Sequence, residues 1–552
     1  MMNIAVGCFC LLMPAFGLAD IVISTKNGQV QGHAITTART GQTIYAFQGI
    51  PYAVPPLGEL RFQEPIPSAP WDGIWDATSD GSACIASNYN PSSQSEDCLF
   101  LNIFVPSLNS SKKYPVMFHI HGGRYIGSSS NFNSYNPSYL VEKDVIVVTH
   151  NYRLGPYGFL STGDLAIPGN AGMKDQVLAL KWVNENIEAF GGDASKITVF
   201  GQSAGGSACG LQVLSKKSAG LFRAAICQSG SGLSPWSVYR SPQTFAYALA
   251  NSIDNRVNNQ TYNTTELNEF LVKQSASAII NAANDIAELF EKEADRLTPT
   301  IEAEHEGAFL TENPYDLMES GDFNQVPLII GICSEEGLAF VNSVDMAKSE
   351  AKKLDSEPEY IYPYDFEAED PSNEDTIENF IKRIYLEPNQ TFGDNLYQVI
   401  RFKSDDMFTR GVIKHGEMQS RFANVYFYKF SFDGSLNYGN TNIPGGEGKC
   451  PHGADLAYLF TRGANYSSLP DADKLMIDRM TTLWTNFAKY LNPTPEKDEV
   501  LGNFIWPKFN DSSFQYVNIT INFDVLENPM EETYSKWNEA YYRWNKRPFT
   551  TF

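Results

Sequence analysis

The stretch TVFGQSAGG, residues 198–206, decides how this chain is expected to fold. Its first half is β-branched and aromatic, as in a strand, whereas the residues from Ala204 onward are small and begin a helix-forming run. Ser203 therefore lies on a predicted strand-to-helix turn, where Gly201 and Gly205 let strand and helix approach closely. Such a turn strains its central residue and is typical of a nucleophilic serine. Gly-x-Ser-x-Gly also occurs in ordinary loops, so the rest of the chain has to supply the partners of a nucleophile.

Short apolar runs on both sides of this turn are predicted to be strands of one sheet. Most are apolar throughout rather than alternating, which is typical of strands covered on both faces. Between them, residues 175–190 place apolar side chains at helical spacing. The alternation predicts the α/β class, with a large, mostly parallel sheet and helices on both faces. We expect strands over residues 115–120, 145–150, 197–200, 223–228, 326–332 and 424–432.

The first residues resemble a secretory signal peptide. The apolar stretch 4–18 is too short to span a bilayer, and Ala19 ends a small-residue pattern typical of cleavage sites. We expect a signal peptide over residues 1–19, a single domain over residues 20–552, and a secreted protein. No later segment approaches 18 uninterrupted apolar residues, so no stable membrane insertion is expected. The polar segment 348–375 is interpreted as a surface excursion rather than a domain boundary.

Charge and cysteine usage narrow the class of partner. The formal net charge of −23 argues against a polyanionic partner such as nucleic acid and leaves a small molecule as the expected ligand. No clustered Cys/His set suggests a metal, and no cofactor is expected. Seven N-x-S/T sequons allow glycosylation on a secretory route, and the oligomeric state is left open. After removal of the signal, six cysteines remain: Cys84, Cys98, Cys209, Cys227, Cys333 and Cys450.

A nucleophilic serine of this type is followed along the chain first by an acid and then by a histidine. Only His415 and His452 come late enough to be that histidine. His415 lies in a helical-looking, mostly polar stretch and is interpreted as a solvated side chain. His452 lies in a Gly/Pro loop before a predicted helix, where a base would be presented to the serine. We therefore predict His452 as the general base.

The acid is expected where the apolar strand 326–332 ends. Glu335 and Glu336 both follow that strand, and the pair could equally be a plain exposed turn. An acid here would accept the imidazole N–H and stabilise the imidazolium. The neighbouring Gly337 favours Glu336, but the pattern by itself barely separates it from Glu335.

Backbone donors for a developing oxyanion are expected in HIHGGRY, residues 119–125. This stretch follows an early predicted strand, and its glycines can bring backbone N–H groups to a carbonyl oxygen. A pair of glycines is usually only a turn, but its position after that strand favours the functional interpretation. The N–H of Ala204 would contribute a further donor.

With these residues assembled, the chain resembles the type-B carboxylesterase/lipase family, the cholinesterase-like branch of the α/β-hydrolases, and is similar within it to insect-type carboxylesterases. The resemblance covers essentially the whole mature chain. It implies the α/β-hydrolase fold and matches Ser203, Glu336 and His452 to the catalytic triad of the family. Its motifs are YAFQGIPYAVPPLGELRF (45–62), EDCLFLNIFVP (96–106), NYRLGPYGFL (151–160), GNAGMKDQVLALKWVNENIEAFGGD (169–193) and FGQSAGG (200–206). It also implies a disulfide and two structural ion pairs: Cys84–Cys98, Arg61–Glu96 and Arg153–Asp175.

The oxyanion motif departs from the family. The third position after the histidine is usually Gly or Ala, but here it is Arg124. Its backbone N–H remains available, so the expected oxyanion hole is Gly123, Arg124 and Ala204. The long charged side chain has to point away or narrow the gorge that leads to the serine.

The resemblance also bears on the substrate. The loop between Cys84 and Cys98 contains no tryptophan, which argues against a choline ester because a quaternary ammonium needs an aromatic face. Trp236 resembles an acyl-pocket residue and is predicted to bind substrate, although an ordinary core tryptophan is as good an interpretation. Many relatives have Glu at the position of Gln202, and a glutamine there resembles the insect juvenile-hormone esterases and some antennal esterases. The cysteines outside the predicted disulfide are expected to be buried free thiols.

These observations favour a secreted serine carboxylic-ester hydrolase that works through an acyl-enzyme on Ser203, with a small-molecule ester as substrate. One alternative is a catalytically impaired, cholinesterase-like binding protein, for which Arg124 is the only positive support. Another is a neutral-lipid lipase, which would use the same triad on long-chain, emulsified esters.

Overall fold

The computed structural model describes residues 21–109, 111–290, 297–437, 443, 450–510 and 513–552. The predicted signal peptide, residues 1–19, lies outside these ranges. None of the helices within them combines the length and the apolar composition that a bilayer crossing requires.

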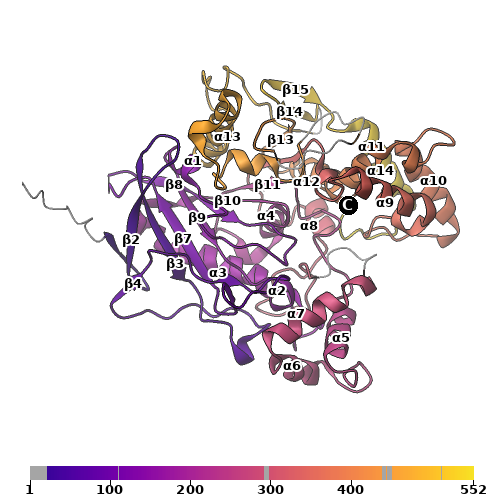
Figure 1. The fold of residues 1–552 in the computed structure, drawn as a ribbon, viewed down its shortest axis with the longest axis horizontal. Coiled ribbons are helices and arrows are strands. Elements are labelled where there is room, and N and C mark those ends of the chain that lie inside the picture. Colours follow the sequence, from indigo (N-terminus) through magenta and orange to yellow (C-terminus); the bar gives the residue numbers. More distant parts are fainter. Residues whose placement is uncertain (1–20, 110, 291–296, 438–442, 444–449, 511–512) are drawn as a thin grey trace, which may run out of the picture.

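One large sheet runs through the molecule (Figure 1). The strands are β1 (Ile21–Thr25), β2 (Gly28–Thr36), β3 (Thr43–Pro51), β4 (Ile74–Asp76), β5 (Ala83–Cys84), β6 (Gln94–Ser95), β7 (Phe100–Val105), β8 (Tyr114–Ile120), β9 (Ile146–His150), β10 (Gly192–Gln202), β11 (Ala224–Gln228), β12 (Leu328–Cys333), β13 (Val425–Phe430), β14 (Gln515–Ile519) and β15 (Phe523–Glu527). Their order is β1-β2-β3-β7-β9-β8-β10-β11-β12-β13-β14-β15, with β4 beside β2 and a separate β5–β6 pair. From β9 to β14 neighbouring strands are parallel, whereas both ends of the sheet are antiparallel. The predicted large, mostly parallel sheet is confirmed, and each of the six predicted strands is present.

Helices cover both faces of this sheet. They are α1 (Ser138–Val141), α2 (Gly155–Phe159), α3 (Ala171–Asn186), α4 (Ala204–Leu214), α5 (Pro242–Ile253), α6 (Thr264–Val272), α7 (Ala276–Asp285), α8 (Pro314–Ser320), α9 (Val344–Ser356), α10 (Glu374–Tyr385), α11 (Leu396–Ser404), α12 (Arg410–Gln419), α13 (Asp471–Tyr490) and α14 (Glu531–Trp544). Along β8, Val116 and Phe118 belong to the core cluster that includes α3 and α4. Met117, between them, belongs to the cluster that includes α1 and α13. Because successive side chains point to opposite faces, a strand covered on both sides has to be apolar throughout.

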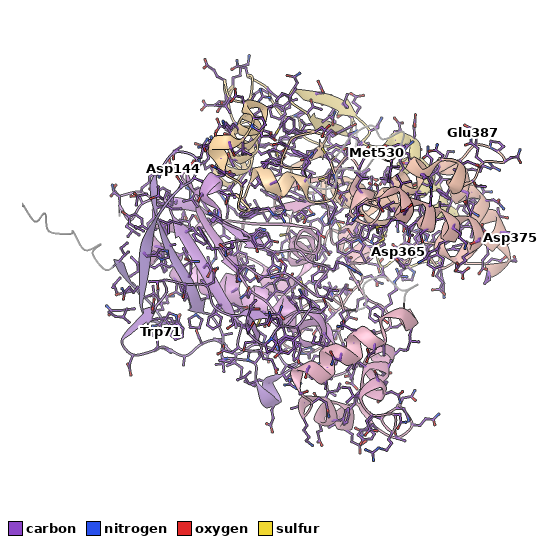
Figure 2. All side chains as sticks on the ribbon, viewed as in Figure 1. Trp71, Asp144, Asp365, Asp375, Glu387 and Met530 are labelled. Atoms are coloured by element: carbon purple, nitrogen blue, oxygen red, sulfur yellow. A yellow bond between two sulfur atoms is a disulfide. The ribbon has the colours of Figure 1, made fainter. Side chains whose placement is uncertain are left out.

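The polar segment 348–375 is more buried than its composition suggests. It begins within α9, which packs against α11, and Asp365 farther along is fully buried. Asp365 lies among the helices at the end of the molecule away from β2 (Figure 2) and forms an ion pair of 2.9 Å with the fully buried Arg410 of α12. The prediction of a surface excursion is therefore wrong for this part, because a charged partner distant in sequence makes burial of the carboxylate possible.

His415 is also not solvated. It lies on α12 as the sequence predicts, but its side chain is fully buried, and its Nε2 donates to Gln419 Oε1 at 3.0 Å. Burial lowers the pKa of His415 to about 4. The polar composition of the helix predicted exposure, whereas packing against α4 at Gly210 removes this position from water.

Candidate active site

Ser203 lies between the end of β10 and the start of α4, as predicted. Its backbone has φ 61° and ψ −127°, an unfavourable region for a residue with a side chain. A Cβ at Gly201 would lie 2.5 Å from the carbonyl oxygen of Ile120, and one at Gly205 would lie 2.1 Å from the same atom. Glycine is therefore required on both sides of the serine, because strand, helix and the neighbouring β8 meet there at backbone distance. The result is a strained turn at the carboxyl end of β10, with Ser203 in the wall of a cavity.

His452 and Glu336 come together from distant parts of the chain. Glu336 begins a short 3₁₀ helix (Glu336–Ala339) three residues after β12 and is completely buried. Its Oε1 accepts the backbone N–H of Cys333 at 2.7 Å, and its Oε2 lies 2.6 Å from His452 Nδ1. Since a carboxylate can only accept, His452 donates from Nδ1, which leaves the lone pair on Nε2. The histidine is thus held in the tautomer that can remove a proton from another group.

The Nε2 atom of His452 forms a hydrogen bond with the side chain of Gln202. The Gln202 side-chain nitrogen lies 3.0 Å from it and donates to its lone pair. No hydrogen bond joins the Ser203 hydroxyl to His452 in the part of the chain that the structure describes. Such contacts are often loose before substrate binds. Gln202 was noted from the sequence only for its residue type, and nothing local to it signals a contact across 250 positions.

A cavity of about 420 Å³ brings these groups together, with Ser203, Gln202 and His452 in its wall. The stretch after β8 contributes Gly122 and Gly123, the latter with φ +112°. A Cβ at Gly122 would lie 3.2 Å from the Cβ of Ser203, so this loop touches the serine turn directly. The predicted oxyanion residues Gly123 and Arg124 therefore lie beside Ser203, and Ala204 begins α4, where the first N–H groups of a helix have no partner within it.

Trp236 is buried like a core residue and also lines the catalytic cavity, so a role in substrate binding stays a prediction. It is 3% exposed, and its Nε1 donates to the carbonyl oxygen of Met407 at 2.6 Å, as a core tryptophan would. It also lines the cavity with Ser203. Its ring meets the edge of Phe408 at 5.9 Å, and Phe408 lies with its centroid 4.3 Å from that of His452. This aromatic wall therefore extends from the core to the histidine. No motif in the sequence indicates a role for Phe408.

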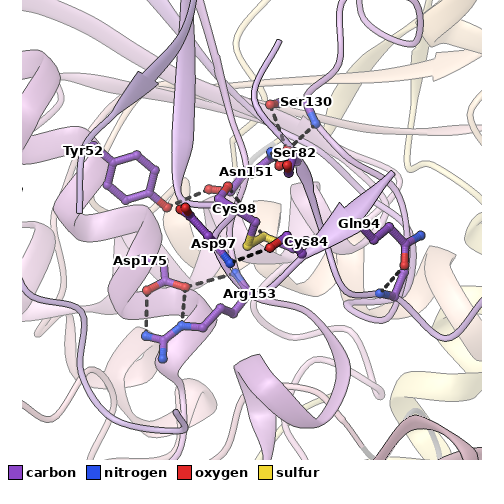
Figure 3. The surroundings of a disulfide bond; sticks show 12 residues. Tyr52, Ser82, Cys84, Gln94, Asp97, Cys98, Ser130, Asn151, Arg153 and Asp175 are labelled. Carbon is purple, nitrogen blue, oxygen red and sulfur yellow. Dashed lines mark hydrogen bonds and ion pairs between the residues drawn. A yellow bond between two sulfur atoms is a disulfide. The ribbon is translucent and has the colours of Figure 1, made fainter. Parts of the chain in front are cut away.

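The disulfide and one of the ion pairs expected from the sequence lie close together (Figure 3). Cys84 and Cys98 form the predicted disulfide. Arg153 binds Asp175 through two hydrogen bonds of 2.8 and 2.7 Å, and both side chains are buried. Both pairings are confirmed, as are the Arg61–Glu96 pair at 2.6 Å and the four buried free thiols, Cys209, Cys227, Cys333 and Cys450.

Comparison with known proteins gives the family and the fold of this chain. A sequence model described as the carboxylesterase family matches residues 19–537. The chain is 32% identical to the juvenile hormone esterase of Tribolium castaneum, over 89% of this chain and 86% of that protein. It is also 32% identical to venom carboxylesterase-6 of Apis mellifera, over 96% and 94% of the two chains. A crystal structure of juvenile hormone esterase from Manduca sexta, with OTFP covalently attached, superposes with a TM-score of 0.82 at 30% identity, covering 95% of this chain and all of that one. The predicted α/β-hydrolase fold is confirmed.

Proposed function

Because this chain belongs to the carboxylesterase family and is a carboxylic ester hydrolase, we propose that Ser203 is its nucleophile, with His452 as general base and Glu336 as the acid that orients His452. The observation that carries the proposal is the chain of contacts from Glu336 through His452 to the wall of the cavity that contains Ser203.

The reaction is a transfer of the acyl group in two halves. His452 Nε2 takes the proton of the Ser203 hydroxyl while Oγ attacks the ester carbonyl carbon, giving a tetrahedral oxyanion. The intermediate collapses, the C–O bond to the alcohol breaks, and the alcohol leaves with the proton from His452. Water, deprotonated by His452, then attacks the acyl-enzyme and releases the carboxylic acid. Gln202 has to release Nε2 for each of these transfers, so its hydrogen bond belongs to the resting enzyme.

The oxyanion would be bound by backbone N–H groups of Gly123, Arg124 and Ala204. Loop and helix start meet at Ser203, which supports this assignment, and removal of one such donor costs about 3–4 kcal/mol of transition-state stabilisation in other enzymes. Arg124 is an exposed residue that lines the same cavity as Ser203. Trp236 would contact the acyl group through the aromatic wall that it shares with Phe408.

We also propose that the protein is secreted after cleavage behind Ala19 and acts as a single domain. The signal-like sequence and the Cys84–Cys98 disulfide, which needs an oxidising compartment, support this. Protein recovered from the medium of expressing cells should begin at Asp20, as read by N-terminal sequencing.

The test of the function is release of 4-nitrophenol from 4-nitrophenyl butanoate, comparing the wild type with Ser203→Ala. Turnover should fall at least about a thousandfold in the variant. Ser356→Ala, on the exposed surface of α9, is the matched control and should retain wild-type turnover. A folded wild type without turnover would contradict the proposed mechanism and favour a binding protein. A Ser203→Ala variant as active as the wild type would contradict it differently, by showing that another group is the nucleophile. Faster cleavage of emulsified long-chain glycerides than of butanoate would instead favour a lipase.

A further inference from the structure

The charge of the catalytic cavity differs from that of the whole chain. The protein carries a formal net charge of −23, yet no Asp or Glu lines this cavity among the described residues. Glu336 lies behind His452, out of reach of a bound molecule. Two arginines line the cavity instead, Arg124 and Arg462. Two cationic side chains and no carboxylate therefore line the space where a substrate would bind, in a protein whose overall field repels anions.

Arg462 is held at the cavity by its backbone, not by a carboxylate. The N–H of the preceding Thr461 donates to the carbonyl oxygen of Asn136 at 3.1 Å, which joins this loop to the segment carrying Tyr135. Arg462 itself has φ 44° and an exposed side chain. Within the described ranges its guanidinium forms no hydrogen bond or ion pair. Its fork of N–H donors is thus free to bind a planar anion.

Arg124 lies between two cavities. It lines the catalytic cavity and also a neighbouring one of about 440 Å³, which reaches toward α5 and α7. The other charged groups of that second cavity, Glu350 and Lys403, are already joined in an ion pair of 3.3 Å. A ligand that passes from the outer cavity to Ser203 therefore passes Arg124.

Part of the wall of the catalytic cavity is apolar. Trp236 and Phe340 both contact the ring of Phe408, each with centroids 5.9 Å apart. A molecule that fills the whole space therefore needs one apolar part and one part that the exposed guanidinium of Arg462 can bind. A wholly neutral ester would use only the first.

We infer that the preferred substrates are carboxylic esters that carry a free carboxylate besides the ester group. Arg462 and Arg124 bind this carboxylate. The apolar part of the substrate contacts Trp236, Phe340 and Phe408. This rests on the proposed function and names the substrate class of the same site. Guanidinium groups bind carboxylates through paired, charge-assisted hydrogen bonds, and each such contact is strong enough to select between otherwise identical substrates.

The experiment compares esters that differ only in the carboxylate. One pair places it on the acyl side, mono-4-nitrophenyl adipate against 4-nitrophenyl hexanoate. The other places it on the leaving group, 3-carboxy-4-nitrophenyl butanoate against 4-nitrophenyl butanoate. In at least one pair the anionic ester should have a kcat/KM about tenfold higher or more, corrected for the intrinsic reactivity of each ester toward hydroxide. That ratio should fall several-fold between about 20 mM and 500 mM NaCl, since exposed guanidinium groups are screened.

Substitution assigns the effect to the two arginines. Arg462→Gln and Arg124→Gln should each lower the anionic-to-neutral ratio about fivefold, whatever happens to the absolute rates. Arg256→Gln removes the same charge from an 83% exposed arginine that is paired with Asp254 outside the cavity, and should leave the ratio unchanged. Ratios at or below one in both pairs for the wild type would overturn the inference, as would equal ratios in Arg462→Gln, Arg124→Gln and Arg256→Gln. If neutral esters are cleaved through Ser203 in either case, the proposed function stands and only the substrate class fails.

Discussion

The serine turn and the histidine loop line the same cavity but are built by different means. Ser203 is fixed by backbone packing, because the glycines beside it meet the carbonyl oxygen of Ile120. His452 is fixed by side chains, since Glu336 holds one ring nitrogen, Gln202 bonds the other, and Phe408 lies against the ring.

The difference means that the two regions should fail in different ways. A change in the serine turn displaces β8 and the oxyanion loop together, so it should lower the free energy of unfolding. A change around the histidine leaves the backbone in place, so it should alter the protonation of the ring and the rate of the reaction. Three substitutions test this difference between the two regions, and a fourth tests a buried histidine outside them. They follow from the largest expected effect to the smallest.

Replacing Glu336, the acid that bonds His452, should cause the largest loss of activity. In Glu336→Gln the amide can donate to Nδ1, so Nε2 becomes the protonated nitrogen and can no longer accept the Ser203 proton. We expect kcat to fall about 10³–10⁴-fold without loss of folding, measured with 4-nitrophenyl butanoate and by circular dichroism. Glu335→Gln is the control: that side chain accepts from Tyr397 at 3.2 Å, and its loss should cost less than about tenfold. The reverse ranking would make Glu335 the acid.

A substitution in the serine turn should instead lower the stability of the protein. In Gly205→Ala the new Cβ would lie 2.1 Å from the carbonyl oxygen of Ile120, an atom that cannot move without β8. We expect a loss of about 3 kcal/mol or more in the free energy of unfolding, seen as a lower urea midpoint. Gly393→Ala, on the exposed 3₁₀ turn before α11, meets no atom nearer than 3.4 Å and should change the midpoint little. Equal midpoints for the two variants would show that the turn tolerates a side chain.

Gln202 links the two regions, and changing its charge should act on the histidine alone. In Gln202→Glu a carboxylate would lie beside Nε2 and favour the charged imidazolium, which cannot accept a proton. The acidic limb of the kcat/KM profile should therefore move to higher pH in Gln202→Glu than in the wild type. Gln202→Met, which has neither the donor nor the charge, should not move the limb upward. A limb that stays in place in Gln202→Glu would contradict the contact.

His415 shows what burial does to a histidine that has no carboxylate partner. Burial lowers its pKa to about 4, so between about pH 4 and 6.5 the unfolded chain binds the proton that the folded chain does not. Stability therefore falls as the pH drops through that window. In His415→Gln the loss between pH 7.0 and 5.5 should be smaller by about 1 kcal/mol, measured as urea midpoints at the two pH values. An unchanged pH dependence would mean that His415 is not the source.

Sequence reasoning was most successful where the determinants are local. The strand before Ser203, the glycines around it and the helix after it are neighbours in the chain, and their steric requirements leave few alternatives. The Cys84–Cys98 disulfide and the two ion pairs came from family motifs, and the structure contains all three. The burial of His415 and Asp365 was missed because their own segments are polar, and their partners lie on other elements.

The sequence by itself determined the sheet, the serine turn and the short set of residues from which a catalytic site could be assembled, because backbone sterics and hydrophobic periodicity act over a few residues. The family resemblance chose Glu336 over Glu335, which the local pattern barely separated. Only the tertiary structure decided that the Glu336 carboxylate contacts His452, that Gln202 bonds Nε2, and that Arg124 and Arg462 line one cavity. Those relations join residues more than a hundred positions apart. They depend on how β8, β10, β12 and the loops beyond them converge at one edge of the sheet, which no local pattern encodes.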